Sequence, residues 1–131
     1  MRCSLLLMTL FLATSSPLYA HGQHSLKVKA SAYTSSVGET DSTPNIGAWG
    51  DTLKPGMKSI AVSRDLLDMG LTHNTEVRIK GLSGTYRVLD KMNKRWTKKI
   101  DIYMGNDVNK AKQWGVRTVT IHWDGEERSR N

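Results

Sequence analysis

The chain has 131 residues, enough for one domain with one hydrophobic core, and carries 19 Lys and Arg residues against 12 Asp and Glu residues. Its one cysteine, Cys3, excludes a scaffold held together by internal disulfides, so the fold must depend on packing. The formal net charge of +7 suits either attraction to anionic polymers or plain solubility, and charge alone does not decide between them.

Residues 1–20 have the pattern of a signal peptide. Arg2 supplies a positive charge, an apolar run follows at 5–13, and the sequence up to Ala20 suits cleavage. The run is too short to span a bilayer, and Cys3 precedes it, whereas a lipid-modified cysteine would follow it. We therefore expect an exported protein of the periplasm or cell envelope, neither a lipoprotein nor a protein with a transmembrane segment.

The start of the mature chain predicts a strand and then a long loop. Residues 21–25 are expected to form a flexible polar leader. From 26 to 34 apolar and polar residues alternate, which predicts a strand with one solvated face. Residues 35–56 are rich in Ser, Thr, Gly and Pro, and a loop of that length in a small domain is usually functional or disordered. Trp49 and Asp51 in this loop are therefore candidate site residues.

The remainder of the chain predicts five further short strands and two short helices. A Gly-Leu-Ser-Gly segment at 81–84 indicates a hairpin, Ser63 is the expected cap of the first helix, and Asn106 is that of the second. This composition indicates a small barrel over residues 26–124, followed by a polar tail at 125–131. The expected strands are 59–63, 76–80, 85–89, 100–104 and 117–123, and the expected helices are 64–69 and 106–114.

Two aspartates stand out because each lies in an apolar, strand-like run. Half-buried pleated surfaces disfavour aspartate, so Asp90 and Asp101 are either functional or members of turns and salt bridges. The segment between them is strongly basic, and it is either a solvated loop or a binding patch. Its cations are Lys91, Lys94, Arg95, Lys98 and Lys99.

The spacing Asp-x(10)-Asp followed by Ile-Tyr-x-Gly, at Asp90, Asp101 and 102–105, resembles the 3D (three-aspartate) domain. That domain is known from the C-terminal part of the membrane-bound lytic transglycosylase A family and from small exported cell-wall proteins. Residues 32–34, 60–62 and 111–117 are similar to other segments of the family, so the resemblance covers 29–123. More distantly, the chain is similar to rare lipoprotein A and expansin-like barrels.

The resemblance implies a mainly β fold, a six-stranded double-psi β-barrel with one or two short helices, that acts on peptidoglycan glycan strands. It implies that Asp101 is the catalytic carboxyl and Asp90 its active-site partner. This chain departs from the family in two places. Ser63 stands where the family's first aspartate is usual, and Lys91-Met92 replaces a small Gly-Gly pair.

Lytic cleavage of a glycan needs one carboxyl, because the sugar's own 6-hydroxyl attacks the anomeric carbon. Asp101 would have to begin the cycle protonated, which requires a pKa raised by burial or by a like charge such as Asp90. Cations within about 4–6 Å of Asp101 would lower that pKa instead. Hydrolysis would need both carboxyls, one as acid and one as nucleophile or base.

Aromatic and cationic side chains are candidate contacts to a glycan. Trp49 and Trp96 could stack on sugar rings, although Trp96 could equally be a core residue. Lys91 and Arg95 could hold the lactyl or peptide carboxylates of peptidoglycan. No cofactor or metal is expected. The full set of candidate substrate-binding residues is Tyr33, Thr34, Trp49, Asp51, Ser63, Lys91, Arg95, Trp96 and Tyr103.

Three functions follow from these observations. The leading hypothesis is an exported peptidoglycan-active enzyme, a lytic transglycosylase or glycosidase. The alternative is a non-catalytic barrel that binds or loosens wall glycan, as expansin-like barrels do. A binder of other anionic polymers rests on charge alone, and we expect no nucleic-acid partner. The expected partner is the glycan strand, with another cell-wall enzyme as a candidate to supply a second wall of the groove, and the protein is expected to be a monomer.

Overall fold

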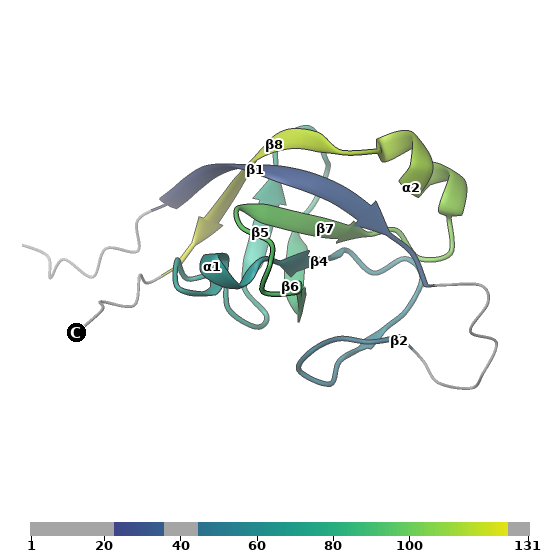
Figure 1. The fold of residues 1–131 in the computed structure, drawn as a ribbon, viewed down its shortest axis with the longest axis horizontal. Coiled ribbons are helices and arrows are strands. Elements are labelled where there is room, and N and C mark those ends of the chain that lie inside the picture. The colour runs from purple at the N-terminus through teal and green to yellow at the C-terminus, as the bar shows by residue number, and fades with distance from the viewer. Residues whose placement is uncertain (1–22, 36–44, 126–131) are drawn as a thin grey trace, which may run out of the picture.

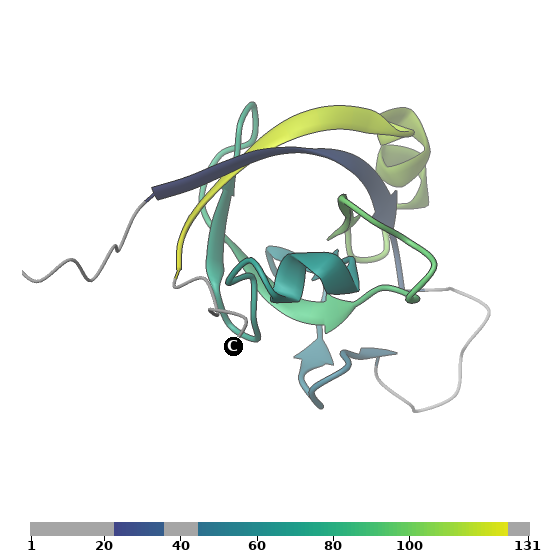
Figure 2. The same cartoon turned by 60° about the vertical axis from the view of Figure 1, so that its left-hand side comes forward.

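The computed structural model describes residues 23–35 and 45–125. Six strands close into a barrel in the order β1-β7-β4-β6-β5-β8, and Figure 2 shows them curving into a ring. With two short helices beside this barrel, the expected fold class, a mainly β six-stranded barrel, is confirmed. The barrel strands are β1 (Gln23–Tyr33), β4 (Ser59–Val62), β5 (Glu76–Ile79), β6 (Tyr86–Lys91), β7 (Lys99–Tyr103) and β8 (Arg117–Asp124), and the helices are α1 (Arg64–Leu67) and α2 (Val108–Trp114).

The barrel is closed by strands that are distant in the sequence. The first strand, β1, pairs in parallel with β7 on one side and antiparallel with β8 on the other. In the same way β4 pairs in parallel with β6 and antiparallel with β7. Closure leaves none of the six strands with an unpaired edge, so the barrel needs no disulfide or partner strand to protect one. The signal peptide and most of the polar tail predicted from the sequence lie outside the described residues.

The period of two along each strand separates an inner from an outer face. Ile100 and Ile102 of β7 point inward and are at most 1% exposed, whereas Asp101 between them is on the outer face. Trp123 of β8 is buried there and donates from its indole nitrogen to the carbonyl of Met69. The inner core consists of Val28, Ala30, Ile60, Val62, Leu66, Leu71, Val77, Ile79, Val88, Ile100, Ile102, Ile121 and Trp123.

A second, smaller apolar cluster lies on the outer face of the barrel. It joins Leu53, Leu89 and Tyr103, with Tyr33 packed against it. Leu53 comes from a small two-stranded ladder, β2 (Asn45–Ile46) and β3 (Thr52–Leu53), within the segment that the sequence predicts as a loop. Figure 1 shows this ladder as a separate lobe below the barrel. The cluster therefore anchors the lobe to the barrel wall.

The structure corrects three details of the sequence prediction. The first strand begins at Gln23 rather than at residue 26, because Gln23–Ser25 pairs with the end of β8 and the His24 ring stacks on Trp123 at 5.3 Å. Helix α2 is capped by Asp107, whose carboxylate accepts from the backbone nitrogen of Lys110 at 2.9 Å, and not by Asn106. Ser63 occupies the cap position of α1, but its side chain makes no capping hydrogen bond.

Candidate functional site

Asp101 lies at the middle of β7, on the outer face of the barrel. The register places it beside Ser31 of β1 and Ala61 of β4. The Ser31 hydroxyl donates a hydrogen bond of 3.1 Å to Oδ1 of Asp101. Ala61 is small, so nothing bulky on β4 covers the carboxyl from that side. Asp101 is consequently half-buried and held in place, but still reachable from solvent.

Asp90 reaches the same outer face through an irregularity in β6. The pairing of β4 with β6 shifts by one residue between Ile60 and Ala61, so that Ala61 faces Asp90 on one side and Asp101 on the other. One carboxylate oxygen of Asp90 accepts from the backbone nitrogens of Ala48 and Lys91, at 2.9 and 2.8 Å. These two bonds hold one carboxylate oxygen and leave the other without a hydrogen-bond partner among the described residues.

Tyr33 lies within the electrostatic reach of both carboxyls. Burial raises the pKa of its hydroxyl, and the charges of Asp90 and Asp101 raise that pKa further. The ring is tilted against that of Tyr103, with 5.4 Å between centroids. Its hydroxyl is buried and has no hydrogen-bond partner among the described residues. Tyr33 therefore contributes a neutral hydroxyl, able to donate a hydrogen bond, beside two acids.

Burial raises the pKa of Asp101, and the nearby charge of Asp90 acts in the same direction. The hydrogen bond from Ser31 and the charge of Lys99 lower this pKa, but they do not cancel the effect of burial. Asp101 thus holds its proton to a higher pH than an ordinary aspartate does. Of the five cations between the two aspartates, Lys99 is the one whose charge lowers the pKa of Asp101.

Tyr103, a member of the outer apolar cluster, packs against Tyr33 and is fixed by a hydrogen bond. Tyr103 is 3% exposed, and its hydroxyl shares a 2.6 Å hydrogen bond with the hydroxyl of Ser35. It therefore supports the site from below and does not present its ring to a ligand. Thr34, which directly follows β1, is half-buried.

Trp49 and Asp51 form a separate cluster beside Asp90. The Trp49 ring stacks on that of His73 with 4.9 Å between centroids, and Asp51 pairs with Nε2 of His73 at 2.5 Å. The Lys91 ammonium lies 5.3 Å from the Trp49 centroid. A hollow of about 320 Å³ is lined by Trp49, His73 and Lys91 together with the end of α1. Asp51 is thus engaged in fixing His73, while Trp49 and Lys91 face an open hollow.

Trp96 and Arg95 lie on the basic segment between β6 and β7. Trp96 is 36% exposed, with the Lys99 ammonium 3.7 Å and the Arg95 guanidinium 4.8 Å from its ring centroid. The indole is therefore not a core residue, and its ring is already engaged by two cations. Because Lys99 also acts on Asp101, this cationic cluster borders the carboxylate site.

Ser63 does not belong to the site. It is 0% exposed, and its hydroxyl accepts from the backbone nitrogen of Lys99 at 3.0 Å. Its one hydroxyl is therefore sealed into the junction of β4 with β7, away from solvent, where the sequence had suggested contact with substrate. A serine fits this position because it satisfies a backbone donor without burying a charge.

Sequence reasoning missed three groups that the structure brings to these sites. Ser31 carried a signal, because it has the same parity along β1 as Tyr33 and so faces the same side. No sequence signal pointed to the backbone nitrogen of Ala48 or the ring of His73, because their partners are distant in the sequence and are brought close only by the tertiary fold. Among the described residues, no group of three or more His, Cys, Asp or Glu side chains is placed to hold a metal ion, and no helix is long and apolar enough to cross a membrane.

No protein-family model matches the chain, and no curated protein matches it in sequence. Among solved structures it is similar to the Streptomyces papain inhibitor, with a TM-score of 0.51 and 18% identity over 77% of this chain and 94% of that one. It is also similar to the apo expansin of Clavibacter michiganensis, with a TM-score of 0.51 and 17% identity over 82% of this chain. A mutant of that expansin in complex with cellohexaose matches with a TM-score of 0.50 and 16% identity.

The chain spans about half of the expansin, 52% and 54% of the two expansin chains. At these identities the likeness concerns the fold. Both kinds of neighbour are barrels of the double-psi type, in agreement with the fold class expected from the sequence.

Proposed function

We propose that this protein is an exported barrel that binds the polysaccharide of a cell wall, with the glycan lying across the outer face of β1, β7 and β6. The observation that carries the proposal is the gathering of Asp101 and Asp90 on one solvent-reachable face, with the buried, neutral Tyr33 hydroxyl within their electrostatic reach. Carboxylates accept hydrogen bonds from sugar hydroxyls. The fold shared with an expansin that has been crystallised with cellohexaose supports a glycan as the ligand.

The cationic cluster beside Asp101 favours a glycan that carries carboxylates. Lys99 and Arg95 lie over Trp96 at the edge of the site, so a neutral strand would leave both cations without an anionic partner. Peptidoglycan supplies such groups through its lactyl ethers and peptides. This is the ligand that the resemblance to the 3D domain also implies, and we take it as the preferred one.

Co-sedimentation with purified peptidoglycan and with cellulose tests the proposal. We expect the protein to pellet with peptidoglycan, and Asp101→Asn to weaken that binding about tenfold, because hydrogen bonds to a charged group are worth about 1.5–3 kcal/mol. Asp124→Asn, an exposed aspartate on β8, is the matched control and should bind as the wild type does. Circular dichroism would establish that both variants are folded.

Two results would contradict the proposal. Wild-type protein that pellets with neither polysaccharide is not a wall-glycan binder. Binding that disappears at moderate salt and is equally strong for DNA reports only the net charge of the chain.

Cleavage of the glycan is a second candidate function, and the raised pKa of Asp101 favours it. In a lytic reaction the protonated carboxyl gives its proton to the glycosidic oxygen. The sugar's 6-hydroxyl then attacks the anomeric carbon, closes a 1,6-anhydro ring and returns a proton to Asp101. Mass spectrometry of digested peptidoglycan would reveal 1,6-anhydro-muropeptides. A protein that binds but releases none of them is a binder and not a transglycosylase.

A further inference from the structure

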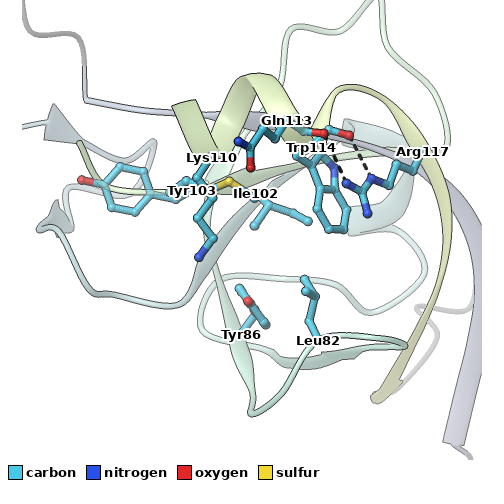
Figure 3. Close-up of a pocket in the computed structure, with 9 residues that line it drawn as sticks. Leu82, Tyr86, Ile102, Tyr103, Lys110, Gln113, Trp114 and Arg117 are labelled. Carbon is cyan, nitrogen blue, oxygen red and sulfur yellow. Dashed lines mark hydrogen bonds between the residues drawn. The ribbon is translucent and has the colours of Figure 1, made fainter. Parts of the chain in front are cut away.

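A groove lies between α2 and the start of β6, apart from the carboxylate site. Two adjoining hollows of about 230 and 190 Å³ form it, and neither is lined by Asp90 or Asp101. Tyr103 lines both hollows, but Figure 3 shows its ring directed away from Leu82 and Trp114, and it packs in the outer cluster. The hollows share Tyr86, Tyr103, Met104 and Lys110, so they are continuous.

The larger hollow has apolar walls. Leu82, Tyr86 and Ile102 lie on the barrel side, and Trp114 faces them from α2. The Trp114 indole is fixed in position, because its nitrogen donates to the carbonyl of Ala30 at 3.0 Å. A pre-formed apolar hollow of this kind accepts the apolar part of a ligand.

The charges around the groove are mainly positive. Lys58, Lys110 and Arg117 line it against one carboxylate, Asp107. That carboxylate is already engaged, since one of its oxygens caps α2 by accepting from the backbone nitrogen of Lys110. The groove therefore favours an anionic ligand.

One of the three cations is free to bind such a ligand. Arg117 donates to carbonyls at the end of α2 and lies 4.1 Å from the Trp114 ring centroid, and Lys58 donates to the carbonyl of Ser83. The Lys110 ammonium has no hydrogen bond or ion pair with any residue that the structure describes. Figure 3 shows it reaching into the open space between Tyr103 and Tyr86. Tyr86 adds a hydroxyl that stays neutral, because burial raises its pKa.

The smaller hollow is suited to a peptide backbone. Gly56 and Gly105 line it, and no atom lies within 4 Å of where a side-chain carbon would stand at Gly56, so a chain could approach the wall there. Lys110 lies at the junction of the two hollows. A carboxylate held there would have an apolar pocket on one side and, on the other, a second hollow with two glycines in its wall.

We propose that this groove binds the carboxyl end of a peptide, with the terminal carboxylate on Lys110 and Tyr86, the last side chain against Leu82 and Trp114, and the preceding peptide group beside Gly56 and Gly105. A free acid of similar size would use the cation and the apolar wall but not the second hollow. This site lies beyond the glycan surface proposed above and does not depend on it.

The test is an amide chemical-shift titration of the protein with N-acetyl-alanyl-leucine and with the C-terminal amide of the same peptide. We expect saturable shifts at residues around Met104, Lys110 and Trp114 with the acid, and binding about tenfold weaker with the amide, which lacks the charge. Lys110→Met should weaken binding of the acid to a similar extent. Lys112→Met, on the same helix but outside the groove, should leave it unchanged.

Equal binding of acid and amide, or equal losses in the two lysine variants, would overturn the proposal. Binding of 4-methylpentanoate as tight as that of the peptide would overturn the assignment of a peptide ligand. Asp101→Asn should bind the peptide normally even where it loses wall binding, so the two proposals can fail separately.

Discussion

At the scale of single residues, opposing interactions set the pKa of Asp101. Burial and Asp90 raise the pKa of Asp101, while Ser31 and Lys99 lower it, and burial prevails. The sequence raised both possibilities, a raised pKa for catalysis and a lowered one from the cations, without deciding between them. Burial decides, because it outweighs both the hydrogen bond from Ser31 and the charge of Lys99.

The raised pKa has a consequence for stability. A carboxyl whose pKa is higher in the folded than in the unfolded chain stabilises the fold below the unfolded pKa, here 3.8, and loses that contribution as the pH rises through the folded pKa. We therefore expect Asp101→Asn to have a higher Tm than wild type at pH 7, with the difference vanishing below about pH 3.8.

Thermal unfolding followed by circular dichroism at both pH values measures this effect. The contributions of neighbouring groups to the pKa of Asp101 can be measured from the chemical shift of its carboxyl carbon during a pH titration. Ser31→Ala should raise the pKa of Asp101 and Asp90→Asn should lower it, because the first removes a donor and the second a like charge. An Asp101→Asn variant that is less stable than wild type at pH 7 would show that the carboxylate is a structural partner.

At the scale of elements, the turn between β2 and β3 positions Asp90. The turn delivers the backbone nitrogen of Ala48 to the carboxylate, and it packs closely on β6 at Gly47. A side-chain carbon added at Gly47 would lie only 2.1 Å from the carbonyl oxygen of Leu89. The sequence indicated that this loop is functional, but its Gly, Ser and Pro content could not show which strand it covers.

We expect Gly47→Ala to displace this turn and release Asp90, with a loss of peptidoglycan binding comparable to that of Asp90→Asn. The barrel itself should remain, because its core does not include the turn. Ala48→Ser is the control on the same turn, because this side chain is exposed and the backbone nitrogen that donates to Asp90 is retained. Binding that survives Gly47→Ala would mean that the turn does not position Asp90.

At the scale of the whole molecule, β1 closes the barrel by pairing with β7 along one edge and β8 along the other. Its first residues, expected from the sequence to be a flexible leader, complete the pairing with the end of β8. His24 stacks on the buried Trp123 and its ring nitrogen bonds the carbonyl of Gly125 at 2.7 Å. The polar composition of these residues suggested a leader. Local sequence could not reveal that they pair with the end of β8, about a hundred positions away.

The first described residues are either a flexible leader or the start of β1, and the two interpretations predict different effects of His24→Ala on stability. If the residue completes the barrel, its loss should cost about 1–2 kcal/mol, the sum of one ring contact and one hydrogen bond. Lys27→Ala, exposed on the same strand, should change stability by less than about 0.5 kcal/mol. Urea unfolding of the two variants gives the comparison, and equal stabilities would restore the leader interpretation.

What the sequence by itself determined is the set of six barrel strands and the alternation of residues along them. Alternation at 26–34 already predicted a first strand with one solvated face, because the period of two is a property of the local chain. Only the tertiary structure decided which residues lie next to one another in the site. The parallel pairing of β1 with β7 sets Ser31 beside Asp101, the irregular pairing of β4 with β6 brings Asp90 to the same face, and the packing of α1 and β7 buries Ser63. Strand pairing joins residues tens of positions apart through backbone groups that every residue carries, so no local pattern in the sequence specifies it.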